Sequence, residues 1–429
     1  MRLAMTRHTL RAICAVLSIA LLGGAALTWW LDGRSVPGPD LNEARRASMA
    51  GQWDLVESAL RPYLPRHPKD AEAQILMARA EAARGDTASC LRRLAAVPEG
   101  SGWSAQARLR EAQILHLNNQ GARAERAYRR ALEEASRFAG AYSTVDAARL
   151  GLVQICGLEE RYDEAREQLW QLLPSSPVPA AVLAIFAMIE AVGTEPNQAI
   201  ETLEKFIAND ADDFHARRAL GHHLTVLGRT NDARPILQGC VRERPGDLRA
   251  AEALAECLFD MADFDSWEAL LQQVPEPGRA KAWYWRHRAA VCDRTSAWSA
   301  ARDCYAEAIR LDPYDATGHH QLGAVLQRLG AAVEGREHIE RGFELRSARR
   351  QLLDLYGQLI NTGVQSGGPG PNADLCYRLG ATCQELGLSE AREWYREALR
   401  RASDHALSRA ALKEMQSADD RKDAAVRED

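Results

Sequence analysis

The chain has 429 residues, of which 46% are hydrophobic and 26% are charged, as is usual for a folded protein. Its net charge of −5 offers no broad basic surface, so binding to nucleic acid is not expected. The nine cysteines form no C-x-x-C motif, which excludes the common zinc-ribbon, thioredoxin-like and c-type haem sites.

The first predicted element is the uncharged segment 12–31, AICAVLSIALLGGAALTWWL. Its 20 residues are long enough to span the hydrocarbon core of a bilayer. Arginines precede it and two tryptophans end it, at the level where indole rings favour a membrane interface. The pattern predicts a single-pass membrane helix, with a cytoplasmic tail at 1–11 and a linker at 32–40. The rest of the chain is then expected on the extracytoplasmic (periplasmic) side.

The alternative for the same segment is a signal peptide. The small residues Gly24, Ala25 and Ala26 could form its cleavage site. In that case the protein would be secreted after cleavage and would have no anchor.

A period of 34 residues runs through the predicted array at 41–349. It is clearest in repeats that start at residues 180, 214, 248, 282 and 316. Three columns of each repeat hold mostly small residues: Ala187, Gly221, Ala255, Ala289 and Gly323; Ala199, Ala233, Trp267, Ala301 and Gly335; Phe206, Cys240, Val274, Ala308 and Gly342. Small side chains at facing positions let two helices approach closely, and Gly228 and Gly330 are predicted to end the first helix. Because one hairpin cannot bury its own apolar faces, the hairpins are expected to stack.

The period fails after residue 349. Residues 350–372 are predicted to form an extra helix followed by a flexible, glycine-rich loop. Residues 373–417 are predicted to form a last repeat and a capping helix. The charged end at 418–429 is expected to be disordered.

These columns resemble the tetratricopeptide repeat (TPR) family. The best matches read AWSAARDCYAEAIRLDPYD (297–315) and LSEAREWYREALRRASDH (388–405). The resemblance implies an all-α solenoid, a right-handed superhelix of helix–turn–helix repeats, that binds other proteins or peptides.

In the TPR family the first helices of the repeats line a concave groove. The resemblance therefore implies a partner-binding surface that presents Arg218, His222, Glu252, Glu256, Phe259, Asp260, Trp283, Arg286, Arg294, His320, Arg328 and Tyr377. Mixed charge with aromatic side chains suits a peptide or protein partner. For any one of these residues the alternative is a solvated helix face. Glu252 and Glu256 stand where some TPR modules hold an acidic C-terminus with basic residues, so such a partner is not expected.

The expected function is a non-catalytic protein–protein interaction scaffold, tethered to a membrane and involved in assembling an envelope complex. The alternative is an accessory subunit that presents a substrate to a partner enzyme, in cofactor maturation or glycan transfer. No catalytic residue, metal ligand or cofactor is predicted, because the chain contains neither G-x-S-x-G nor H-E-x-x-H. The adjacent His222 and His223 would point about 100° apart on a helix, which does not suit a shared metal ion.

Overall fold

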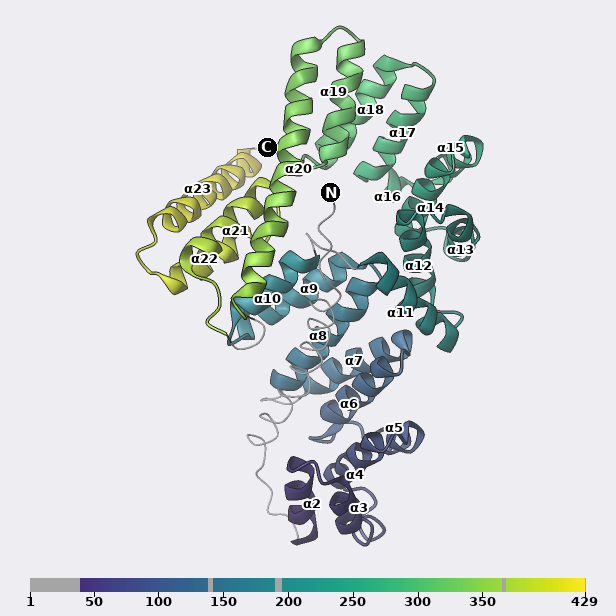
Figure 1. Cartoon of the computed structure of the whole chain (residues 1–429), viewed down its shortest axis with the longest axis vertical. Coiled ribbons are helices and arrows are strands. Elements are labelled where there is room, and N and C mark those ends of the chain that lie inside the picture. Colours follow the sequence, from purple (N-terminus) through teal and green to yellow (C-terminus); the bar gives the residue numbers. More distant parts are fainter. Residues whose placement is uncertain (1–38, 138–141, 190–194, 365–367, 429) are drawn as a thin grey trace. The chain divides into compact units, whose positions relative to one another are not determined.

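The computed structural model describes residues 39–137, 142–189, 195–364 and 368–428, and every regular element in these ranges is helical (Figure 1). This confirms the all-α prediction for the described part of the chain. The predicted tail 1–11, membrane helix 12–31 and residues 32–38 of the linker lie outside it. Among the helices that are described, none has both the length and the apolar composition of a membrane span.

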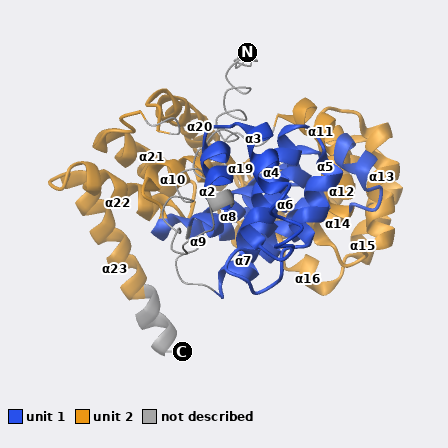
Figure 2. Ribbon diagram, turned by 90° about the horizontal axis from the view of Figure 1, so that it is seen from below, with its two compact units in different colours: residues 1–175, 204–213 blue, residues 176–203, 214–429 orange. Residues whose placement is uncertain are grey.

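The chain divides into two compact units (Figure 2). Unit 1 comprises Met1–Ser175 and Glu204–Asp213, and unit 2 comprises Ser176–Leu203 and Phe214–Asp429. The helices of unit 1 are α2 (Pro39–Met49), α3 (Trp53–Leu60), α4 (Ala71–Ala83), α5 (Thr87–Ala95), α6 (Ser104–Leu117), α7 (Gly121–Ala135), α8 (Tyr142–Leu158), α9 (Tyr162–Leu172) and the 3₁₀ turn η1 (Leu173–Ser175). Helix α11 (Pro196–Asn209) contributes to both units.

Unit 2 holds the more regular repeats. Its other helices are α10 (Pro179–Ala187), α12 (Phe214–Val226), α13 (Thr230–Glu243), α14 (Leu248–Asp260), α15 (Phe264–Gln273), α16 (Glu276–Arg279), α17 (Ala282–Arg294), α18 (Trp298–Leu311), α19 (Ala316–Arg328), α20 (Ala332–Asn361), α21 (Ala373–Glu385), α22 (Ala391–Arg401) and α23 (Ala406–Glu428).

Within each unit, consecutive helices pack as hairpins and the hairpins stack. Helix α6 packs against α7 and α12 against α13, while first helices also contact the first helix of the next hairpin, as α4 does with α6 and α12 with α14. The predicted small columns lie where the helices are closest. A Cβ atom placed on Gly221 would lie 2.6 Å from Cδ2 of Leu237, and one on Gly323 would lie 2.5 Å from the carbonyl oxygen of Gly335.

In the regular repeats from α12 to α20, the first helix of each hairpin ends at a residue with positive φ, as predicted for Gly228 and Gly330. This angle is +74° at Gly228 and +86° at Gly330. The two intervening repeats place Ala262 and Ser296 at the same position, with φ of 57° and 58°. The turn geometry is therefore kept even where the sequence has no glycine.

The structure differs from the prediction at the end of the array. The expected boundary at 349/350 falls inside α20, which is one continuous helix of 30 residues. Leu345, Ala348, Leu352, Leu355 and Leu359 are all buried and recur every three or four residues. One apolar face therefore crosses the position where the repeat period fails, and no proline interrupts the helix.

Helix α10 is buried almost all round. Val182, Leu183, Ile185 and Phe186 are each at most 7% exposed. The helix packs against α20 and α22, which come more than a hundred residues later (Figure 1). An apolar helix with no polar face needs cover on several sides, and these two distant helices supply it.

In the segment 418–429, which is expected from its sequence to be disordered, α23 continues as far as Glu428. Its residues are mostly good helix formers. An ion pair between Arg392 and Asp419 and a hydrogen bond from Nε2 of Gln416 to Oδ1 of Asp420 (3.1 Å) add local support.

Candidate functional site

The predicted groove residues lie mainly on four first helices of unit 2: α12, α14, α17 and α19. Their second helices, α13, α15, α18 and α20, each pack against the first helix of the same hairpin. We call the side of the first helices that carries His222, Glu256 and Arg286 the first-helix face.

A chain of ionic contacts runs along the first-helix face. Nε2 of His222 on α12 lies 3.4 Å from Oε2 of Glu256 on α14. Nη2 of Arg286 on α17 lies 4.0 Å from Oε1 of Glu256. Nη1 of the same arginine donates a hydrogen bond of 3.0 Å to Oδ2 of Asp315. Side chains from three predicted positions are therefore brought together, and all three are between 28% and 34% exposed.

Sequence reasoning missed Asp315. This aspartate is the N-cap of α19, where its side chain accepts from the backbone N–H of Thr317. An aspartate directly before a predicted helix is a typical N-cap residue. The position of Asp315 could therefore have been predicted from the sequence. Because Asp315 holds Arg286 more closely than Glu256 does, the arginine is shared between two carboxylates.

Burial and neighbouring charge set the acidity of the carboxyl groups on α14. Burial, with the added repulsion of Glu256, raises the pKa of Glu252 to about 7. Burial and Glu256 also raise the pKa of Asp260. Burial would raise the pKa of Glu256 too, but the hydrogen bond from His222 and the nearby positive charges bring it below its ordinary value.

An aromatic cluster borders these carboxylates. Phe259 on α14 is 42% exposed, and its ring centroid lies 5.1 Å from that of the fully buried Trp267. His287 on α17 lies 5.6 Å from Trp267 and 6.1 Å from Trp283, measured between ring centroids. The exposed edge of an otherwise buried cluster is a common anchor for a protein partner.

The other predicted residues are placed less favourably. Arg218 and Trp283 are buried, so neither offers its side chain freely to a partner. His320 is exposed on α19. Arg328 donates to Asp293 at 2.6 Å and lies over the Trp298 ring, with Cζ 4.6 Å from the ring centroid. Arg294 likewise lies over an aromatic ring, that of Phe264, with Cζ 3.7 Å from the ring centroid.

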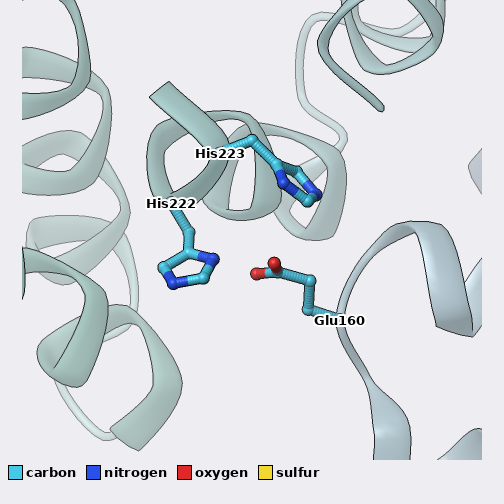
Figure 3. Close-up of side chains that lie close together, drawn as sticks. All are labelled: Glu160, His222 and His223. Atoms are coloured by element: carbon cyan, nitrogen blue, oxygen red, sulfur yellow. The ribbon is translucent and has the colours of Figure 1, made fainter. Parts of the chain in front are cut away.

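Tyr377 lies on α21, in a different hairpin from the ionic contacts. Its ring neighbours are Tyr395 and His405, at centroid distances of 5.8 and 5.6 Å. Figure 3 shows that His222 and His223 leave α12 in different directions, as expected for adjacent helical residues. Glu160, drawn in the same figure, belongs to unit 1.

One group of side chains in unit 1 has the residue types of a metal site. Ligand atoms of Glu125, Cys156 and Glu164 lie within 4.8 Å of one another. Arg161, however, donates hydrogen bonds to both glutamates, at 2.7 Å to each. Burial also raises the pKa of the Cys156 thiol to about 12, which disfavours the thiolate that a metal ion requires. The guanidinium group already supplies the positive charge, so the geometry favours a structural ion-pair network.

Comparisons with known proteins concern the same region of unit 2. Residues 224–290, from the end of α12 into α17, match a family model described as a tetratricopeptide repeat. No curated protein matches the chain.

Solved structures with some similarity include MamA from Desulfovibrio magneticus RS-1, with 20% identity over 36% of this chain and 86% of that chain and a TM-score of 0.31. A tetratricopeptide repeat protein from Parabacteroides merdae ATCC 43184 shares 14% identity over 60% of this chain and 98% of its own, with a TM-score of 0.30. The Cut9–Hcn1 hetero-tetramer of APC/C shares 14% identity over 94% of this chain and 87% of that chain, with a TM-score of 0.33. The family match and the stacked hairpins together make residues 224–290 similar to tetratricopeptide repeats.

Proposed function

We propose that this protein is a non-catalytic scaffold that binds a peptide or protein partner on the first-helix face of unit 2. The observation that carries the proposal is the partly exposed chain of ionic contacts from His222 through Glu256 to Arg286, bordered by the exposed Phe259 ring. Partly buried charges beside an exposed aromatic edge offer both orientation and apolar contact area to a partner.

The stacking of the hairpins supports an extended binding surface. Because α12 contacts α14 and α14 contacts α17, their side chains form one surface that crosses three repeats. Such a surface suits an elongated segment better than a compact small molecule. The proposal includes a membrane tether at residues 12–31 and an extracytoplasmic location for the repeats, with a role in assembling an envelope complex. Both rest on the apolar N-terminal sequence.

The test is recovery of partners with the full chain from mildly solubilised membranes. The variant E256Q/F259A removes one charge and one exposed ring from the first-helix face. The variant E340Q/F343A removes the same two groups, at the same spacing, from the exposed side of α20, where Phe343 is 60% exposed. Wild type and the α20 variant should recover the same proteins, and E256Q/F259A should lose them.

Phe259 also contacts the buried Trp267, so the stability of each variant has to be measured alongside. The single substitution E256Q keeps that contact and provides a second comparison. Equal recovery of partners by the wild type and by both face variants would show that binding occurs elsewhere on the chain.

A further inference from the structure

The first-helix face has more acidic than basic groups around α14. Glu252, Glu256 and Asp260 follow one another at intervals of four residues, so they lie along one side of the helix. Arg286 on α17 contacts Glu256, but it lies closer to a fourth carboxylate, that of Asp315. The acidic side of α14 therefore lacks a full set of cationic partners within unit 2.

The raised pKa of Glu252 agrees with this excess of acidic over basic groups around α14. Glu252 faces Glu256 and Arg249 on its own helix, His222 from α12 and Arg286 from α17. Even with these bases present, its pKa is raised to about 7, first by burial and then by Glu256. An added positive charge at this place would stabilise the ionised form of Glu252.

A second and independent observation comes from His287. Nδ1 of this histidine accepts a hydrogen bond of 3.2 Å from Nε1–H of Trp267, because an indole nitrogen can only donate. The neutral ring must then carry its proton on Nε2, since burial lowers the pKa of His287 to about 4.

Nε2 of His287 is buried and has no hydrogen-bond partner among the described residues, although the residue is only 7% exposed. It lies on the side of the ring away from the Trp267 contact, and Phe259 and Glu256 of α14 are close to the same ring. An unsatisfied buried N–H is costly, so an acceptor supplied by a partner would be stabilising at this position.

We infer that the first-helix face takes a peptide segment carrying a lysine or arginine, whose cation lies against Glu252, Glu256 and Asp260 while a backbone carbonyl oxygen accepts from Nε2 of His287. The inference rests on the proposed function and adds the chemistry of the partner. The edge of Phe259 then covers the aliphatic stem of the basic side chain.

The experiment is selection of displayed random nonapeptides by the purified full chain. Peptides kept by the wild type should be enriched in lysine or arginine at one position. That enrichment should disappear with E252Q/E256Q and persist with E337Q/E340Q, a pair of exposed glutamates on α20. His287→Asn leaves an acceptor oxygen near the position of Nδ1 but removes the Nε2 donor, and it should weaken binding of the selected peptides several-fold.

The possible outcomes separate the two proposals. Neutral or acidic peptides that bind the first-helix face would overturn this inference and leave the proposed function in place. Failure to select any peptide above the background would count against both. Basic peptides that bind E252Q/E256Q as well as the wild type would also overturn the inference, since their cation would lie elsewhere.

The pH dependence of binding gives a readout that a merely structural role would not produce. The cation binds the ionised form of Glu252, so affinity for a selected basic peptide should rise between pH 6 and pH 8, by about tenfold at most. Binding near pH 7 should release a fraction of a proton, measurable by calorimetry in buffers of different ionisation enthalpy. E252Q should flatten the rise, and an affinity that falls over this range would contradict the inference.

Discussion

At the scale of single residues, the turn inside each hairpin places one residue in the left-handed region of φ. Glycine adopts this conformation freely, but a residue with a Cβ atom does so at a cost of about 1 kcal/mol. Gly228 and Gly330 stand at this position in two repeats of unit 2, and Ala262 and Ser296 stand there in the two between them.

The substitution Ala262→Gly should therefore stabilise the protein, because it relieves strain that the fold imposes on a non-glycine residue. An increase of about 0.5–1 kcal/mol in the free energy of unfolding is expected from urea titration. Gly228→Ala, at the equivalent turn, should lower the free energy of unfolding by a similar amount. A loss of stability in the Ala262→Gly variant would mean that the alanine side chain contributes packing that outweighs the strain.

Glycines on the helices give a second pair of predictions with opposite signs. A Cβ atom on Gly323 would meet the backbone of Gly335, which cannot move without separating α19 from α20. Gly323→Ala should cost about 1–3 kcal/mol in unfolding free energy. Gly357 is exposed on α20 and has nothing within 4 Å of the same position. Gly357→Ala should stabilise the helix by about 0.5–1 kcal/mol, and equal effects in the two variants would contradict the close approach of α19 and α20.

The small residues were the part of the structure that the sequence predicted best. Gly221 and Gly323 hold one column of the repeat and Gly335 another, because close helix packing leaves no room for a Cβ atom, and that requirement is visible in one sequence. The ionic contacts were less predictable. Adjacent repeats bring His222, Glu256 and Arg286 together, but rotamers and competing partners such as Asp315 decide which pairs form. Burial of Arg218 and Trp283 likewise depends on packing that the repeat pattern does not specify.

At the scale of elements, α20 joins the regular repeats to the C-terminal hairpin. The failure of the period at 349 suggested that a separate, extra helix begins at 350, whereas α20 continues without interruption because its apolar face continues. The 34-residue period reflects hairpins of constant length. It is therefore lost where a helix, such as α20, extends beyond the length of one repeat. The apolar sequence of α10 predicted burial but not which distant helices would provide it.

The contacts of α10 predict the effect of shortening the chain. A protein that ends after residue 349 lacks α22 and residues 350–361 of α20, so the buried apolar side chains of α10 would lose part of their cover. It should bind a hydrophobic dye and aggregate, and its unfolding transition should broaden.

A chain that ends after residue 417 is the matched control. It keeps α10 fully packed and loses only the end of α23 with the ion pair between Arg392 and Asp419. This control should remain monodisperse and unfold cooperatively. If the chain ending at 349 behaved in the same way, α10 would not depend on the C-terminal helices.

At the scale of the whole molecule, the proposed tether makes a prediction for cell fractions. The full chain should sediment with membranes and resist extraction at high pH, because about 20 apolar residues hold it in the bilayer. A chain that begins at residue 39 should stay in the supernatant. Mass spectrometry of the mature full-length protein is the control, since absence of residues 1–26 would establish cleavage and secretion in place of anchoring.

The packing of α10 has a further consequence for the order in which the protein can be completed on the ribosome. Its apolar residues are synthesised before roughly 200 further residues that lead up to the end of α22. At usual elongation rates that interval lasts about 10–40 s. During this time α10 is translated but uncovered, whereas hairpins such as α12 and α13 find their partners within the next few residues. The nascent chain is therefore most exposed to aggregation, and most in need of a chaperone, between the emergence of α10 and that of α22.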